Sequence, residues 1–249
     1  IKYFCSYKFK MKYVLLFIAL FFTFHSYAQS FRYSSKVFDE VDTLKEVEYA
    51  TAPWLNNPIA LLSMYNIHEG EMTTEERPLL MDIYLPKADT LEKRPAVVFV
   101  HGGAFILGSR QNEDMVALCD SFARRGYVTA SIDYRLGMSA MVTRFFGIIT
   151  QIHVPKSSGI RALYRATQDG RAAIRFLKHN AAEYRIDTTN IFMVGSSAGA
   201  ITGLNNIYVD RDEVPPEAKT APVLGNPDTI GINGYGSEAD ALVSYWGAV

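Results

Sequence analysis

The stretch that most constrains this 249-residue chain is residues 190–201, which read N-I-F-M-V-G-S-S-A-G-A-I. An apolar run stops abruptly at G-S-S-A-G, and this pattern predicts a buried strand that enters a G-x-S-x-G turn. In such a turn Ser197 lies between strand and helix with its hydroxyl exposed, and Gly195 and Gly199 leave room for the backbone to cross. The pattern favours a serine nucleophile. A helix that starts with small residues and packs on a sheet would give the same letters, so the neighbouring segments must decide.

Strands and helices alternate on both sides of this turn. Apolar or alternating runs predict strands at 79–85, 95–100 and 127–133 and a further buried strand at 241–247, with weaker, exposed strands at 34–41 and 45–50. Helices are predicted at 113–125, at 160–177 and directly after Ser197, whereas 53–77, 138–160, 187–190 and 209–240 are interpreted as turns or irregular connections. This order predicts an α/β fold, a mostly parallel sheet with helices on both faces.

Three polar or glycine-rich segments directly follow predicted strands. They are H-G-G-A at 101–104, D-Y-R at 133–135 and G-S-S-A-G at 195–199. Because ligands bind at the carboxyl ends of the strands in such sheets, we expect the three segments to converge on one rim.

The order of these motifs resembles the α/β-hydrolase fold and, within it, the carboxylesterase and hormone-sensitive-lipase-like branch of bacterial esterases. The resemblance spans residues 79–249. It implies a serine ester hydrolase in which Ser197 is the nucleophile of an acyl-enzyme. It also implies that the backbone N–H groups of Gly103, Ala104 and Ala198 form an oxyanion hole for the charge that develops on the carbonyl oxygen.

Other motif residues are given supporting roles. Gly102, Gly195 and Gly199 are expected to let the backbone approach the substrate and cross the turn, and His101 is expected to order the oxyanion loop rather than to act as the base. Asp133 and Arg135 are interpreted as a brace for that loop, with Asp169 as a partner of Arg135. The alternative is an ordinary surface ion pair that contributes little.

The chain departs from the family pattern after the nucleophile. The family's triad runs Ser, then Asp or Glu, then His, yet no histidine follows Ser197. His153 and His179 precede Ser197 and do not fit the topology. The candidate acids precede the last predicted strand; they are Asp210, Asp212, Asp228 and Asp240. We therefore expect an incomplete α/β-hydrolase domain whose last strands, triad acid and histidine are absent, inactive and poorly folded by itself.

The first residues are expected to be removed from the mature protein. Residues 1–10 precede Met11 and are interpreted as an upstream leader without structure, and 11–28 as a signal peptide cleaved after Ala28, which predicts a secreted or periplasmic protein. The apolar run is short for a bilayer span, although an uncleaved anchor is the alternative. Residues 29–249 are then the partial hydrolase domain.

Cysteine content, histidine placement and charge argue against a disulfide-stabilised, metal-binding or nucleic-acid-binding protein. Only Cys119 remains after residue 28, so no intrachain disulfide is expected, and His68 is interpreted as a surface histidine without metal-ligand companions. No metal or cofactor is predicted. A net charge of −1 gives no field that would attract nucleic acid.

The predicted partner is a small-molecule or polysaccharide-borne ester, with acetyl or feruloyl groups favoured. Two alternatives stay open: a serine peptidase of the prolyl-oligopeptidase type, and a catalytically dead hydrolase-like binding protein.

Overall fold

The computed structural model describes residues 31–55, 74–137, 141–145, 148–153, 155–220 and 223–247. The predicted leader, signal peptide and surface His68 lie outside these residues. Among the helices described, none is both long and apolar enough to cross a membrane.

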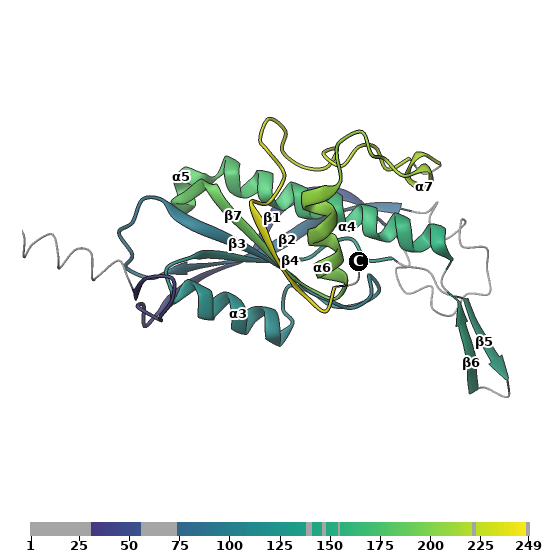
Figure 1. Cartoon of the computed structure of the whole chain (residues 1–249), viewed down its shortest axis with the longest axis horizontal. Helices are drawn as coiled ribbons and strands as arrows, with labels where there is room; N and C mark the ends of the chain where they lie inside the picture. The colour runs from purple at the N-terminus through teal and green to yellow at the C-terminus, as the bar shows by residue number, and fades with distance from the viewer. Residues whose placement is uncertain are drawn as a thin grey trace, which may run out of the picture.

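A six-stranded sheet forms the centre of the molecule (Figure 1). Its strands are β1 (Val41–Leu55), β2 (Thr74–Pro86), β3 (Arg94–Val100), β4 (Val128–Ile132), β7 (Ile186–Ser196) and β8 (Ala241–Tyr245). They are arranged in the order β1-β2-β4-β3-β7-β8. The pairs β3–β4, β3–β7 and β7–β8 are parallel, whereas β1–β2 and β2–β4 are antiparallel. The mostly parallel α/β sheet predicted from the sequence is therefore confirmed.

Helices cover the two faces of this sheet (Figure 1). One face carries α3 (Glu113–Ala123), and the other carries α4 (Lys156–His179) and α6 (Ala198–Tyr208). Two short helices, α5 (Ala181–Tyr184) and α7 (Pro216–Lys219), complete the helical segments described. Because α3 follows β3 on one face while α6 follows the neighbouring β7 on the other, β3 and β7 form a topological switch point, where such folds bind ligands.

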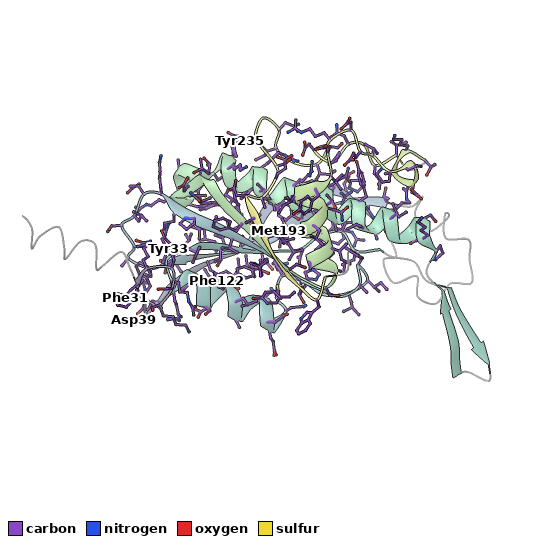
Figure 2. The ribbon with its side chains drawn as sticks, viewed as in Figure 1. Phe31, Tyr33, Asp39, Phe122, Met193 and Tyr235 are labelled. Atoms are coloured by element: carbon purple, nitrogen blue, oxygen red, sulfur yellow. The ribbon has the colours of Figure 1, made fainter. Side chains whose placement is uncertain are left out.

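The two cores follow from the alternation of side chains along β3. Val97 and Phe99 point to the α3 side, where they pack with Met115 and Cys119, and Phe99 meets Phe122 edge to face at 5.5 Å. Figure 2 shows Phe122 on α3 and Met193 on β7. The intervening Ala96, Val98 and Val100 belong to the larger core, which includes α4 residues. Cys119 is buried, as expected for a small core side chain.

Several predicted elements differ in the structure. Residues 34–40 form the end of a turn and an irregular segment rather than a strand, and the exposed strand predicted at 45–50 belongs to a longer β1 that reaches Leu55. The connection is shorter than the predicted 53–77, because β1 continues to Leu55 and β2 already begins at Thr74.

Two further differences concern connections. Within 138–160 the structure has the antiparallel hairpin of β5 (Met141–Phe145) and β6 (Ile148–His153), and α4 already begins at Lys156. The predicted turn at 187–190 lies inside β7, where the register with β3 jumps from Ile186 to Ile191. The Asp187 carboxylate accepts a hydrogen bond from the Thr189 N–H there, as a local turn would.

β8 is a strand, as predicted, but it is not buried. It lies at the edge of the sheet, and most of its residues are exposed. Val243 is 49% exposed and Tyr245 is 44% exposed. Its apolar sequence suggested a strand covered on both faces, and this was wrong because apolar content does not reveal a strand's place in the sheet.

Candidate active site

Ser197 occupies the turn between β7 and α6. Its φ of 52° and ψ of −113° lie outside the regions that L-residues usually adopt, a conformation that costs about 1–3 kcal/mol and is typical of functional sites. The residue is exposed, and its N–H donates to the Tyr245 carbonyl oxygen at the end of β8 (2.7 Å). The predicted strand, turn and helix around Ser197 are therefore present.

Close backbone packing explains the glycines on both sides of the turn. A Cβ on Gly195 would lie 2.2 Å from the Gly199 carbonyl oxygen, and one on Gly199 would lie 2.1 Å from the carbonyl oxygen of Val100. Either contact would force the backbone apart. Gly199 therefore brings the start of α6 directly against the end of β3.

This packing brings the H-G-G-A segment beside the serine. A Cβ placed on Gly102 would lie 3.3 Å from the Ser197 Cβ and 3.1 Å from the Ser196 carbonyl oxygen. Two motifs about 95 residues apart in sequence thus meet at the switch point between β3 and β7.

The segment after Gly102 is a tight turn with unusual dihedrals. Gly103, Ala104 and Phe105 have φ values of 119°, 54° and 59°. The carbonyl oxygen of Gly103 accepts hydrogen bonds from the N–H groups of Ile106 and Leu107, which closes the turn. The N–H groups of Gly103, Ala104 and Ala198 meet no acceptor within the part of the chain that the structure describes. Ala104 is exposed, so this backbone is accessible to a ligand.

His101 is held under this turn. Its ring is 1% exposed and stacks on Tyr134 with 4.3 Å between the ring centroids. The Nδ1 atom lies 2.6 Å from the Gly102 carbonyl oxygen, and the Tyr134 hydroxyl donates to the His101 carbonyl oxygen (3.1 Å). Burial lowers the pKa of the imidazole, which favours the neutral ring. These contacts are those expected of a residue that orders the loop.

Arg135 forms a buried ion pair with Asp169. The Arg135 Nη2 atom lies 2.8 Å from Asp169 Oδ1, and the side chains are 1% and 0% exposed. Arg135 Nη2 also donates to Gln168 Oε1 (2.9 Å), and the Arg135 N–H donates to Asp169 Oδ2 (2.7 Å). The expected pairing with Asp169 is present, and the alternative of an ordinary surface ion pair is wrong because both groups are removed from water.

Asp133 has a partner that the sequence did not reveal. Its Oδ1 accepts the N–H of Arg110 (2.7 Å), and its Oδ2 accepts a hydrogen bond from the Arg110 guanidinium. Arg110 Nε donates to Asp82 Oδ1 (2.9 Å), and the Arg110 carbonyl oxygen accepts the Ser131 hydroxyl (2.8 Å). Arg110 therefore fixes the downstream end of the oxyanion loop to β2 and β4. The sequence held one signal of this partner: Asp82 is a single aspartate within the otherwise apolar run L-L-M-D-I-Y-L at 79–85.

The remaining candidate acids and histidines lie elsewhere. His179 ends α4 and lies 3.0 Å from the Tyr235 hydroxyl, near the residues that precede β7, whereas Ser197 follows the opposite end of that strand. Asp228 pairs with Arg175, and Asp240 accepts the Ile191 N–H. The His153 side chain is outside the described residues. Within those residues no group of histidine, cysteine and acidic side chains is arranged to hold a metal ion.

Known proteins match the segments of this chain that carry the three motifs. The model of the BD-FAE family matches residues 81–149 and 156–211, about half of the chain and all the motif residues discussed above. Gut esterase 1 of Caenorhabditis briggsae is 29% identical over 141 residues, which are 56% of this chain and 22% of that protein. Bile salt-activated lipase of Mus musculus is 28% identical over 184 residues, which are 65% of this chain and 29% of the lipase.

Solved structures align with part of the chain. The native Est2 esterase of Thermogutta terrifontis aligns over 69% of this chain and 49% of its own, with 25% identity and a TM-score of 0.46. The chain spans less than a third of the length of gut esterase 1 and of the bile salt-activated lipase.

We predict that Arg110→Met destabilises the fold by about 3–5 kcal/mol, because it leaves the buried Asp82 and the partly buried Asp133 without their shared cation. The matched control is Arg124→Met. Arg124 pairs with Asp120 on the surface, so its loss should lower the free energy of unfolding much less than the loss of Arg110. Urea unfolding measures both free energies, and equal losses would contradict the structural role of Arg110.

We also predict a pH effect from His101. Its pKa is lowered in the folded state, so the unfolded chain takes up the proton first as the pH falls below the ordinary imidazole value of about 6.5. This contribution to stability is present above that pH and is lost as the pH falls toward the folded-state pKa. In His101→Phe the free energy of unfolding should therefore fall less steeply between about pH 7.5 and pH 5.5 than in the wild type. Parallel curves from urea unfolding would contradict the prediction.

Proposed function

This chain belongs to the BD-FAE family, and from that premise we propose that it serves a carboxylic-ester hydrolase that works through an acyl-enzyme on Ser197. The α/β-hydrolase fold and the esterase relatives support this proposal. The observation that carries it is the exposed Ser197 in a strained turn, beside a loop whose Gly103 and Ala104 N–H groups meet no acceptor in the described chain. We propose residues 29–249 as a partial hydrolase domain.

In the proposed reaction, Ser197 Oγ attacks the ester carbonyl carbon while its proton passes to a general base. The carbonyl oxygen gains negative charge, and the N–H groups of Gly103, Ala104 and Ala198 stabilise it. Each such donor is typically worth about 3 kcal/mol in the transition state. The alcohol then leaves with the proton from the base, and water releases the acid from the acyl-enzyme. Gly102, Gly195 and Gly199 permit this arrangement through their close backbone contacts.

We propose that the general base comes from outside the described residues. The His101 ring is buried against Tyr134 and Gly102, and His179 is near the other end of β7. No histidine follows Ser197 in the sequence. Because the triad acts as a unit, loss of the base costs on the order of a millionfold in turnover.

The proposed substrates are short acyl esters, such as acetyl or feruloyl esters, free or borne by a polysaccharide. The side chain of Leu107 supports an apolar acyl contact. It is 63% exposed, and its Cδ1 lies 3.1 Å from where a Cβ on Gly103 would be. A comparison of p-nitrophenyl acetate with longer acyl esters and methyl ferulate tests this choice. Faster turnover of long-chain esters would contradict it.

We further propose that the protein is exported and cleaved after Ala28. The basic start, the short apolar run and the S-Y-A segment at 26–28 support this proposal. The mature protein recovered from its native host should then begin at Gln29 by mass spectrometry. An intact 11–28 segment in the membrane fraction would instead favour an anchor.

We predict that Ser197→Ala lowers p-nitrophenyl acetate hydrolysis by the intact protein by about a millionfold, to the level without a nucleophile. The matched control is Ser196→Ala, one residue earlier at the end of β7, which should keep most of the activity. Equal activity in the wild type and Ser197→Ala would contradict the assignment. Cleavage of dipeptide anilides in preference to esters would favour the peptidase, and absence of both activities together with no organophosphonate adduct would favour a binding protein.

A second prediction concerns the general base. Added imidazole should accelerate ester hydrolysis by the 249-residue chain, because a free imidazole can accept the Ser197 proton. Ser197→Ala measured at the same imidazole concentrations gives the rate without the nucleophile. Equal hydrolysis rates for the wild-type chain and Ser197→Ala in imidazole would contradict the predicted rescue. A large loss of activity in His153→Ala without imidazole would instead assign the general base to His153, whose side chain is outside the described residues.

A further inference from the structure

The long connection from α6 to β8 lies along the outer side of α4 (Figure 1). Apart from α7, the described part of this connection has no regular secondary structure. Side chains of α4 donate to its carbonyl oxygens: Arg175 Nε to Ile232 (2.6 Å), and Gln168 Nε2 to Leu224 and Asn226 (2.6 and 2.9 Å). These bonds explain why a polar helix face is buried, since buried polar groups need partners.

Positive charges outnumber negative ones where this connection crosses α4. Arg175 Nη1 and Arg211 Nε each lie 2.7 Å from a carboxylate oxygen of Asp228, and Arg171 Nη1 lies 3.9 Å from the same group. Within the described residues, Glu238 is the other acid that pairs with these arginines. Its Oε1 atom lies 3.7 Å from Arg171 Nη1, and its side chain is 46% exposed. Three guanidinium groups thus share two carboxylates within the described residues, and one of the two is half in solvent.

The buried guanidinium of Arg171 is hydrogen-bonded only in part: its Nη2 atom donates to the carbonyl oxygens of Asn206 (3.1 Å) and Val209. Its side chain is 1% exposed, and its buried Nε and Nη1 atoms have no hydrogen-bond partner in the part of the chain described. Burial lowers the pKa of Arg175, and Arg171 and Arg211 lower it further, while Asp228 opposes them. Buried cations without full partners are costly, so an additional anion here would stabilise the folded state.

A cavity opens beside this cluster. Its volume is about 280 Å³, and its lining includes Arg175, Arg211, Asn226, Asp228, Asn233 and Tyr235. Figure 2 shows Tyr235 on the connection over α4. The Arg211 side chain is 64% exposed, and its ion pair with Asp228 is made by Nε, whereas its two terminal nitrogens contact no acid within the described residues. A planar guanidinium with two parallel N–H donors matches a carboxylate or phosphate group.

We propose that this cavity binds a small oxyanion, a phosphate or carboxylate group, with the Arg211 guanidinium as its direct donor and Arg171 and Arg175 as the buried charges behind it. The site is independent of the proposed esterase site. Tyr235 contacts His179 near the start of β7, and Ser197 follows the end of that strand. Between Ile186 and Gly195, β7 runs beside β3 from Arg94 to Val100, which is roughly 20 Å at the rise of an extended chain.

The test is titration of the full chain with sodium phosphate, sodium malonate and sodium chloride at equal ionic strength, followed by calorimetry and thermal unfolding. Phosphate, malonate or both should bind and raise Tm, whereas chloride should not. Arg211→Ala should weaken that binding about tenfold or more, as expected for loss of a charge-assisted hydrogen bond. The control Arg77→Ala removes an exposed arginine of β2 that pairs with Glu75, and it should leave the affinity unchanged.

Each result decides the proposal. Binding of malonate alone assigns a carboxylate ligand, and binding of phosphate alone assigns a phosphoryl group. Equal Tm shifts with chloride, or equal losses in Arg211→Ala and Arg77→Ala, would overturn the site in favour of general charge screening. Hydrolysis by Arg211→Ala should equal that of the wild type, so failure of this proposal is distinguishable from failure of the proposed esterase activity.

Discussion

The contact between Gly199 and the Val100 carbonyl oxygen sets the geometry of the candidate active site. Because no side chain separates them, α6 begins directly against the end of β3. The same packing places Gly102 beside Ser197, so that the turn after β7 and the turn after β3 face the same space. A larger residue at Gly199 would separate the serine from the Gly103 and Ala104 N–H groups. The proposed chemistry depends on that proximity more than on any single side chain.

Charges on either side of the sheet hold this arrangement in place. Arg110 links Asp82 of β2 to Asp133 after β4, and Arg135 pairs with Asp169 of α4. Both pairs are largely removed from water, and they fix the segments that flank the oxyanion loop. Buried ion pairs contribute little net stability, but removal of one partner is costly. They therefore act mainly by allowing one arrangement of the loop.

The local structure around Ser197 could be predicted from the sequence, whereas the contacts between distant segments could not. The apolar run before Ser197 and the glycines around it specify a strand, a turn and a helix within about twelve residues, and all three are present. Arg110 was missed because its partners are 28 and 23 residues away in sequence. The exposure of β8 was missed because its edge position depends on the order of strands, and the bonds from α4 to the 209–240 connection leave no periodic signal. The catalytic roles of Ser197, Gly103, Ala104 and Ala198 stay predictions.

A crystal structure of the intact protein after reaction with a small organophosphonate ester would test the nucleophile and the oxyanion hole together. We expect a covalent bond from phosphorus to Ser197 Oγ, with the phosphonyl oxygen about 2.7–3.1 Å from the N–H groups of Gly103, Ala104 and Ala198, the usual range for such donors. A phosphonyl group attached to another residue, or an oxygen directed away from these three N–H groups, would contradict it.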